Sequence, residues 1–324
     1  MAETALETVK GEGGSGAAKP VVGDVARVRT MIVNLYFVGE AGAGDRGWVM
    51  VDAGMQGTAP YIAKAAADRF GEGARPSAIV LTHGHFDHVG ALRTLAEKWD
   101  VPVYAHELEL PYVTGRSDYP PPDPTVGGGA MAALSWLYPK HPIDLGGRAR
   151  MLPADGSVPA MPGWRWIHTP GHSPGHVSLF RDRDRTLIAG DAFVTTKQES
   201  AVAALMQPPE VHGPPMYFTA DWRSARRSVE ALAALEPEVA ATGHGLPLRG
   251  ASMQRALHEL AEDFQRLAVP ARGRYVDQPA VTDERGVVSL PPSIPAEMKT
   301  IMLGLGAAVA VGFALGAMRG GERD

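Results

Sequence analysis

Apolar residues along the chain form short, nearly uniform runs that alternate with longer stretches of helical period. The short runs Ala78 to Leu81, Thr186 to Gly190 and Val239 to Ala241 are typical of buried strands. The stretches Asp221 to Leu235 and Ala251 to Leu267 place apolar residues three and four positions apart, as amphipathic helices do. This alternation predicts layers of helix packed on sheet.

The first 70 residues predict a tail, two strands and a helix. Residues 1 to 20 are rich in Gly, Ala and Glu, and we expect them to be disordered. Arg29 to Val38 and Gly47 to Asp52 have the composition of strands and flank a glycine-rich turn. Thr58 to Phe70 predicts a helix that is capped by Thr58.

Residues 106 to 162 form an irregular insertion in the predicted catalytic domain, which covers residues 21 to 268. The proline run from Tyr119 to Pro124 excludes a helix or a central strand, whereas Met131 to Tyr138 predicts a short apolar helix. Long irregular insertions in compact enzymes are functional lids or plain surface loops, and we favour a lid over the substrate. The candidate pocket walls, for which ordinary packing is the alternative, are Trp136, Tyr138, Met216 and Tyr217.

The C-terminal part predicts a linker and an apolar helix. Residues 269 to 300 are rich in proline and are expected to act as a semi-rigid spacer. Residues 301 to 318 lack any polar side chain; at about 1.5 Å per residue they reach roughly 27 Å, close to the ~30 Å hydrocarbon core of a bilayer. We therefore expect a transmembrane helix that anchors the protein, with a soluble helix docked on the domain as the alternative.

Composition restricts the partners and the compartment. The net charge of −5 and the absence of a dense Lys/Arg stripe give no electrostatic case for nucleic acid. Residues 1 to 20 lack the apolar stretch of a signal peptide, and Cys is absent. The expectation is a cytoplasmic catalytic domain, either anchored by its C-terminal helix or fully soluble.

The strongest chemical signal follows the apolar run that ends at Leu81. His83, His85, Asp87 and His88 place three imidazoles and a carboxylate within six residues. These groups are the usual ligands of zinc and similar divalent metals. His83 and His85 are two residues apart, so in extended chain they point the same way and are able to bind one ion. Asp87 and His88 then face a second ion.

Three more residues with metal-binding side chains occur later, each at the end of a strand-like run and beside glycines that permit a sharp turn. They are His172, Asp191 and His244. A single histidine in a loop is more often structural than a metal ligand. The joint occurrence of these three with the first cluster indicates one shared metal site.

In these motifs the chain resembles the metallo-β-lactamase superfamily, whose His-x-His-x-Asp-His signature matches residues 83 to 88. The match continues in the family's order over roughly residues 30 to 250. The resemblance implies a four-layer αββα sandwich with two metal ions. It assigns the first ion to His83, His85 and His172. It assigns the second ion to Asp87, His88 and His244, and it makes Asp191 the bridge between the two.

The implied cofactors are two divalent ions, with zinc favoured and manganese or iron as alternatives. Two such ions about 3.5–4 Å apart share a water and lower its pKa toward ~7, which supplies hydroxide for attack on a carbonyl or phosphoryl centre. Asp87 and Asp191 are the carboxylates expected at this catalytic centre. Asp52 matches a family position behind the ligands, although a plain turn residue at a strand end is an equal alternative.

Departures from known branches narrow the substrate only by exclusion. Di-iron redox members usually have an acidic residue at the position of His85, and many antibiotic hydrolases are exported and use a Cys ligand. Glyoxalase-II-like thioesterases carry a helical C-terminal domain, and homoserine-lactone hydrolases often place a Tyr where this chain has Ala192. We predict a hydrolase of a small ester, lactone or thioester. The alternatives are a hydrolase of β-lactams or phosphodiesters and an inactive, membrane-tethered binding protein.

Overall fold

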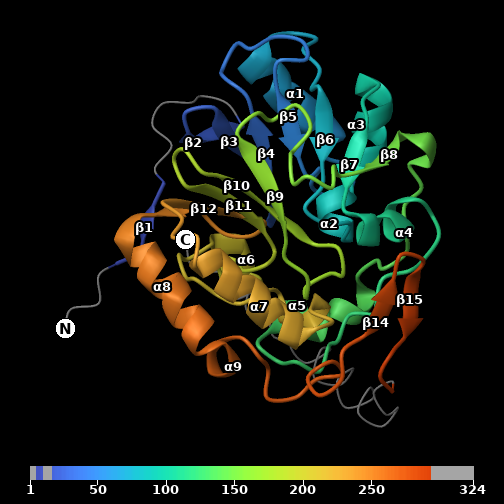
Figure 1. Ribbon diagram of the computed structural model, residues 1–324, viewed down its shortest axis with the longest axis vertical. Coiled ribbons are helices and arrows are strands. Elements are labelled where there is room, and N and C mark those ends of the chain that lie inside the picture. Colours follow the sequence, from blue (N-terminus) through green and yellow to red (C-terminus); the bar gives the residue numbers. More distant parts are fainter. Residues whose placement is uncertain (1–4, 10–16, 293–324) are drawn as a thin grey trace, which may run out of the picture.

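The computed structural model describes residues 5–9 and 17–292 of the 324-residue chain (Figure 1). Two mixed β-sheets lie face to face, and helices cover the outer face of each sheet. This arrangement is the predicted four-layer αββα sandwich.

The first sheet has seven strands in sequence order. Neighbours from β2 to β5 are antiparallel and those from β5 to β8 are parallel. Strands β5 and β6 are buried throughout, which explains their uninterrupted apolar sequence. The strands are β2 (Ala18–Val22), β3 (Val25–Thr30), β4 (Val33–Val38), β5 (Val49–Val51), β6 (Ala78–Val80), β7 (Val103–Ala105) and β8 (Ala149–Met151).

The second sheet has the order β1-β13-β12-β11-β10-β9. Only β11 and β12 are parallel, since the helix between them makes the crossover. Its strands are β1 (Glu7–Thr8), β9 (Trp164–His168), β10 (Val177–Arg181), β11 (Thr186–Gly190), β12 (Val239–Thr242) and β13 (Leu248–Arg249).

Three apolar cores fill the spaces between the four layers. One packs α1 (Ala59–Phe70) and α3 (Leu92–Trp99) on the first sheet, and another packs α7 (Trp222–Ala233) and α8 (Gly250–Glu262) on the second. The third lies between the two sheets, where side chains such as Val80 and Ile188 meet. Apolar side chains thus cover both faces of each sheet, and the residues with metal-binding side chains lie beyond the strand ends.

The predicted helices are present with small changes in their bounds. The helix predicted from Thr58 is α1, but Thr58 does not cap it, because its hydroxyl donates to the carbonyl of Met55. The helix predicted from Asp221 is α7, whose first amides donate to the Asp221 carboxylate. The helix predicted over Ala251 to Leu267 is broken at Asp263 into α8 and the short α9 (Phe264–Leu267).

Two expectations for the N-terminal region were wrong. Arg29 to Val38 is not one strand, because the chain turns at Met31, where φ is +57°, and β3 pairs with β4 as a hairpin. The tail expected to be disordered over residues 1 to 20 contains β1, which pairs with β13, and the start of β2. In both cases the pairing partner is a strand that local composition does not reveal.

The insertion at residues 106 to 162 is more ordered than its sequence suggests. It contains the edge strand β8 and the short helices α4 (Leu110–Val113) and α5 (Ala130–Ala133). It also has three 3₁₀ turns: η1 (Glu107–Glu109), η2 (Ser135–Leu137) and η3 (Gly146–Arg148). Strand β8 extends the first sheet beside β7, and α4 lies near α2 (Phe86–Val89) (Figure 1).

The proline-rich segment after residue 269 is not a free spacer over its described part. It forms the hairpin β14 (Val281–Asp283) and β15 (Gly286–Ser289), and the amide of Arg274 donates to the Asp123 carboxylate in the insertion. Tyr275 is buried and donates to the carbonyl of Pro121 at 2.7 Å. Tertiary contacts therefore dock this segment on the domain, against the expectation from its composition.

The apolar segment expected to form a membrane helix, residues 301 to 318, lies outside the described residues. Among the helices of residues 5–9 and 17–292, none combines the length and the apolar character that crossing a bilayer requires.

Candidate metal centre

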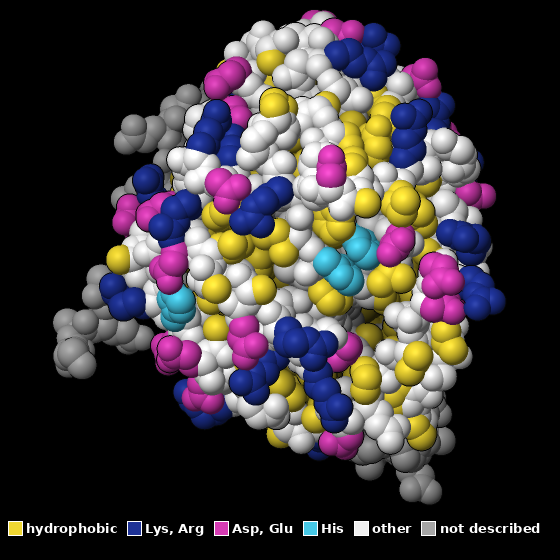
Figure 2. Space-filling view, in the orientation of Figure 1, with side chains coloured by type: hydrophobic (Ala, Val, Ile, Leu, Met, Phe, Trp, Pro, Cys, Tyr) yellow, Lys and Arg dark blue, Asp and Glu magenta, His cyan; other side chains and the backbone are white. Residues whose placement is uncertain are grey.

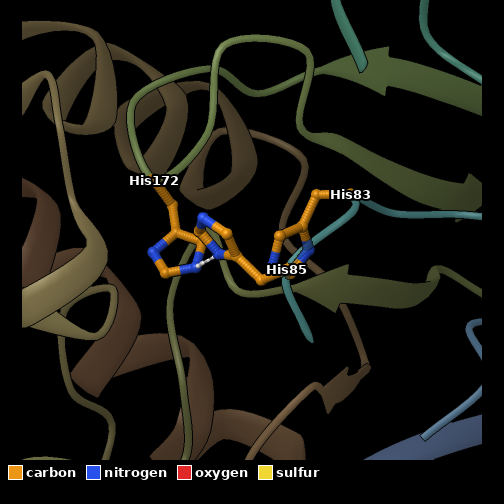
Figure 3. A group of neighbouring side chains, drawn as sticks. All are labelled: His83, His85 and His172. Atoms are coloured by element: carbon orange, nitrogen blue, oxygen red, sulfur yellow. Dashed lines mark hydrogen bonds between the residues drawn. The ribbon is translucent and has the colours of Figure 1, made fainter. Parts of the chain in front are cut away.

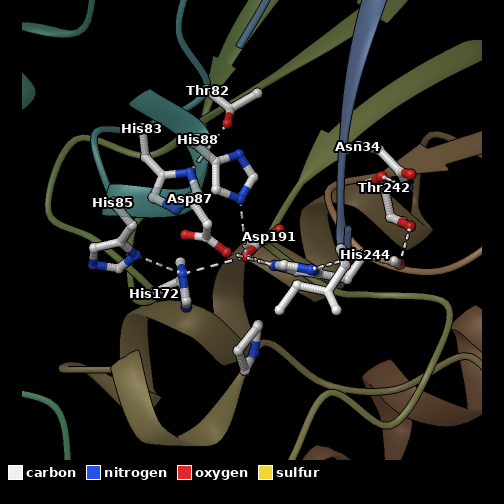
Figure 4. A network of polar contacts seen from close by, with 12 residues as sticks. Asn34, Thr82, His83, His85, Asp87, His88, His172, Asp191, Thr242 and His244 are labelled. Carbon is white, nitrogen blue, oxygen red and sulfur yellow. Dashed lines mark hydrogen bonds and ion pairs between the residues drawn. The ribbon is translucent and has the colours of Figure 1, made fainter. Parts of the chain in front are cut away.

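All seven residues predicted as metal ligands meet at one end of the sandwich. His83 and His85 follow β6, and Asp87 and His88 lie on α2 directly after them. The other three come from loops of the second sheet (Figure 4). They are His172 between β9 and β10, Asp191 after β11 and His244 after β12.

Three overlapping groups of these side chains place their ligand atoms within 4.8 Å of one another. The first group is His83, His85 and His172 (Figure 3). The second group is His83, His88 and Asp191, and the third is Asp87, His88 and His244. The first and third groups are the two triads that the sequence resemblance implies.

Asp191 lies between the two triads. Its Oδ2 atom is 3.5 Å from His172 Nε2 in the first triad. The same oxygen is 3.5 Å from His88 Nε2 and 3.1 Å from His244 Nε2 in the second triad. Ligand atoms that share a tetrahedral zinc at ~2.0–2.1 Å lie about 3.3 Å apart, so these separations suit ions held between the groups.

Buried atoms without partners show that the residues fit metal ions. His83 Nε2, His88 Nε2 and Asp191 Oδ1 are buried and accept or donate no hydrogen bond. Leaving such atoms unpaired costs free energy unless an ion or another group satisfies them. His85 Nδ1 and His172 Nε2 lie 2.9 Å apart and face the same space (Figure 3). The donor set therefore suits divalent cations that bind nitrogen and oxygen.

Comparison with known proteins decides the family. The family model described as the metallo-β-lactamase superfamily matches residues 28–244. The chain belongs to the metallo-β-lactamase superfamily. Together with the buried cluster of imidazoles and carboxylates, this membership makes the protein a metal-dependent hydrolase, as the sequence predicted.

Relatives and solved structures of this superfamily agree. The chain is 49% identical over 256 residues to the probable metallo-hydrolase YflN of Bacillus subtilis, covering 79% of this chain and 95% of the relative. It is 29% identical to the probable metallo-hydrolase YybB of the same organism, over 57% of this chain and 75% of that one. A β-lactamase domain protein from Burkholderia ambifaria shares the fold, with a TM-score of 0.54 at 20% identity over 79% and 80% of the two chains.

Hydrogen bonds from residues behind the cluster determine which ring nitrogen three of the histidines direct toward the centre. His88 Nδ1 is 2.9 Å from Asp52 Oδ2, and His244 Nδ1 is 2.8 Å from the carbonyl of Ile32. His83 Nδ1 lies 3.0 Å from the hydroxyl of Thr82. The Nε2 atoms of these three rings are thereby turned toward the centre, as in metal sites whose ligands are oriented from behind.

The pKa values of the histidines in the cluster are shifted in opposite directions. Burial lowers the pKa of His83 and His85, and it lowers that of His172 to about 3, which favours the neutral form that binds metal. Burial also lowers the pKa of His88, but Asp191 and its neighbouring carboxylates raise it well above its usual value. Burial acts to raise the pKa of Asp191, and the imidazoles of His244 and His88 hold it well below its usual range. The buried carboxylates thus favour positive charge at this centre, which a divalent cation would supply.

Asp52 orients the ligands and is not a plain turn residue. It accepts from the Thr82 amide at 2.8 Å and from the Thr82 hydroxyl at 2.7 Å, in addition to its contact with His88. Its φ of +60° is a backbone conformation that Asn also tolerates. Asp52→Asn therefore tests the carboxylate without straining the backbone.

We expect Asp52→Asn to weaken metal affinity and activity about 10–100-fold, because in either orientation the new amide nitrogen meets another donor, the N–H of His88 or the Thr82 amide. Metal affinity is measured by competition with a chelator. The matched control is Asp155→Asn, which changes an exposed carboxylate of a distant turn. Wild-type metal affinity in Asp52→Asn would show that the Asp52 carboxylate does not orient the ligands.

The other histidines lie outside the ligand cluster, as predicted. His176 does not join the metal groups; it accepts from the Asp191 amide at 2.9 Å and contacts the Thr169 hydroxyl at 2.8 Å. This is the structural hydrogen bonding that we expect from a histidine beside the ligand loop. The remaining five are His106, His141, His168, His212 and His258.

The four residues predicted to line the pocket lie in two different environments. Tyr138, Met216 and Tyr217 belong to an apolar cluster that also contains Phe218, whose ring stacks on His85 at 4.5 Å. Trp136 is outside this cluster and is 53% exposed. Three of the four candidates therefore pack in an apolar cluster beside His85, and their role as pocket walls stays a prediction.

Sequence reasoning missed several residues that hold the ligand loops. Asn34 Nδ2 donates to the carbonyls of Thr242 and Gly245, and the Tyr36 hydroxyl donates to Thr242, so β4 braces the loop that carries His244. The one signal available was an Asn in the middle of an otherwise apolar strand. Glu109, which joins two ligand loops, was also missed.

Proposed function

We propose that the protein is a dinuclear metallohydrolase that cleaves a small neutral ester, lactone or thioester. The observation that carries this proposal is the position of Asp191 Oδ2, within 3.5 Å of imidazoles from both triads. One carboxylate at that place is suited to bind two ions at once.

His83, His85 and His172 would hold one ion, and Asp87, His88 and His244 the other. When bound, such a pair of divalent ions supplies hydroxide at neutral pH and polarises the oxygen of the attacked carbonyl. Zinc is the favoured metal for this nitrogen and oxygen donor set, and manganese and iron are alternatives.

The residues of the chain contribute orientation and charge. Asp52, the Ile32 carbonyl and Thr82 fix three imidazoles, so the ligands need little rearrangement on metal binding. Asp87 Oδ2 is 3.4 Å from His244 Nε2, which places a second carboxylate at the same centre as Asp191. The two carboxylates offset part of the charge of the cations in a buried site.

The wall beside the site supports a neutral, partly apolar substrate. Its described members are all apolar or aromatic: Phe86, Val126, Met131, Ala132, Tyr138, Met216, Tyr217 and Phe218. Phe86 packs on Tyr138 and Phe218 with ring centroids 5.5 and 6.0 Å apart. These rings and aliphatic side chains suit the apolar part of a small ester, lactone or thioester.

The insertion at residues 106 to 162 acts as the lid of this site in our proposal. Its Tyr119 ring lies 4.6 Å from the ring of His85, and its Tyr138 packs against Phe218. The first contact brings the insertion beside His85, and the second brings it beside the ring that stacks on His85. Both contacts support a lid over a plain surface loop.

The surface agrees with a small-molecule substrate. On the face shown in Figure 2, the basic side chains of the described residues are interspersed with acidic ones and form no continuous stripe. A nucleic-acid enzyme would need such a stripe to neutralise phosphates.

Turnover of a substrate panel by the metal-loaded protein tests the proposal. We expect carboxylic esters, lactones or thioesters to be cleaved at least about tenfold faster than phosphodiesters and β-lactams, since only the former match the apolar wall. Faster cleavage of a phosphodiester would overturn the substrate class. No turnover of any class by protein with two bound ions would favour the binding-protein alternative.

A further inference from the structure

Glu109 is a fully buried carboxylate that the proposed chemistry does not use. It lies at the end of η1 in the insertion, with 0% exposure. No Lys, Arg or His is within salt-bridge distance of it in the described part of the chain. A buried carboxylate without a cationic partner is costly unless its oxygens accept several hydrogen bonds.

Four donors satisfy it, two on each oxygen. Oε2 accepts from the amide of Gly84 at 2.9 Å and from the Tyr119 hydroxyl. Oε1 accepts from the Ser173 hydroxyl at 2.7 Å and from the amide of Gly175 at 2.8 Å. A carboxylate has about four acceptor sites, and all are filled here.

Three of these donors, Gly84, Ser173 and Gly175, belong to the two loops that carry the first metal triad. Gly84 lies between His83 and His85, and Ser173 directly follows His172. The two loops are separated by almost ninety residues in the chain, and Glu109 joins them through one side chain. Tyr119 extends the contact, since its ring packs against His85 at 4.6 Å.

The glycines show how closely the loops approach this carboxylate. A Cβ atom on Gly175 would lie 2.7 Å from the amide nitrogen of Glu109 and 2.9 Å from its Cγ. A Cβ on Gly84 would lie 2.5 Å from the Tyr119 hydroxyl and 3.1 Å from Val113. Neither glycine has room for a side chain: Gly175 packs on Glu109 itself, and Gly84 packs on its neighbours Tyr119 and Val113.

We propose that Glu109 is a positioning residue that clamps the His83–His85 loop to the His172 loop and so preorganises the first metal triad. It touches neither substrate nor metal. The inference rests on the proposed metal site, because the benefit of the clamp is that three imidazoles converge before an ion binds. Ligands oriented in this way bind metal more tightly than ligands that must first be ordered.

Glu109→Gln tests the clamp. The amide group presents two N–H donors where the carboxylate had an acceptor, so either Gly84 or Gly175 then faces a donor. We expect metal affinity to fall about 10–100-fold and kcat to fall with little change in KM. In metal-free protein, hydrogen exchange at residues 83–85 or 173–175 should accelerate while exchange in the sheet cores stays unchanged.

Two further variants keep the test decisive. Glu107→Gln alters the exposed neighbour of Glu109 in the same turn and should leave every readout at wild-type values. Ser173→Ala removes one donor from Oε1, and we expect faster exchange at 173–175 with no change at Gly84. If Glu109→Gln is too unstable to purify, Ser173→Ala alone decides.

The outcomes separate this inference from the proposed function. Unchanged exchange in both loops of Glu109→Gln or Ser173→Ala, or exchange that accelerates equally throughout the molecule, would overturn the clamp. Wild-type protein that binds no divalent ion would instead overturn the metal site. Normal metal binding by the wild type together with unchanged affinity in Glu109→Gln would reject the clamp alone.

Discussion

Replacing Asp191 by Ala should abolish hydrolysis and loosen both metal ions. The carboxylate contacts imidazoles of both triads, so its removal would take a ligand from each of the two proposed sites in one step. Bound ions supply several kcal/mol of transition-state stabilisation, so we expect the rate to fall by more than about 10³-fold. Turnover and metal content of the purified variant are the two measurements.

The control for this prediction is Asp182→Ala, which removes an exposed carboxylate that is paired only with Arg165. It should retain wild-type turnover and metal content. Thermal unfolding of both variants shows whether the fold persists. Full activity of folded Asp191→Ala would contradict the bridging role.

Gly243→Ala should produce the second-largest loss, although position 243 is not a ligand. An added Cβ would overlap Asp191 Oδ1 and come within 2.7 Å of His88 Cε1. The Gly243 carbonyl accepts from the Asn34 amide, and the Gly243 amide donates to the carbonyl of Gly190, so the loop has little freedom to move away. We expect activity to fall about 100-fold, as for ligands displaced by ~1 Å, and stability to fall by about 1–3 kcal/mol.

Gly147→Ala is the matched control, since a Cβ at that exposed position meets no atom within 4 Å. Steady-state kinetics and thermal unfolding of the two variants are compared side by side. If Gly243→Ala were as active as Gly147→Ala, the close packing around Asp191 would not matter for catalysis.

The convergence of the proposed ligands was predictable because most of them follow buried strands. Runs such as Ala78 to Leu81 must be central strands, and the chain leaves a central strand at the edge of the sheet. Polar residues just beyond such runs therefore meet at one edge, which is where the structure places His83 and Asp191. The position of Asp52 at this edge was predictable for the same reason, since it directly follows β5, but its hydrogen bond to His88 was not.

The residues that orient the ligands were less accessible, because their partners are remote in the sequence. Glu109 lies in a segment whose proline-rich surroundings suggested a loose loop, and its donors come from before and after the insertion. Asn34 lies on a strand whose pairing with β3 was hidden by the predicted single strand. Long-range hydrogen bonds of this kind leave no local pattern in hydrophobicity or spacing.

The docking of the segment after residue 269 also depends on long-range contacts that its own sequence does not reveal. Its prolines predicted a spacer, yet the backbone carbonyl of Pro291 accepts from the Arg274 side chain at 2.7 Å, and Tyr275 is buried against the domain. Composition reports the local stiffness of a segment, whereas its docking depends on the surface that the rest of the chain provides.

The central claim is that one buried cluster holds two divalent ions that hydrolysis requires. Its most direct test is the metal-to-protein ratio of the purified full chain, measured by elemental analysis beside turnover before and after removal of metal with a chelator. The account predicts close to two ions per chain, loss of turnover in the stripped protein and its return when zinc or manganese is added back. Full turnover by protein stripped of metal would contradict it.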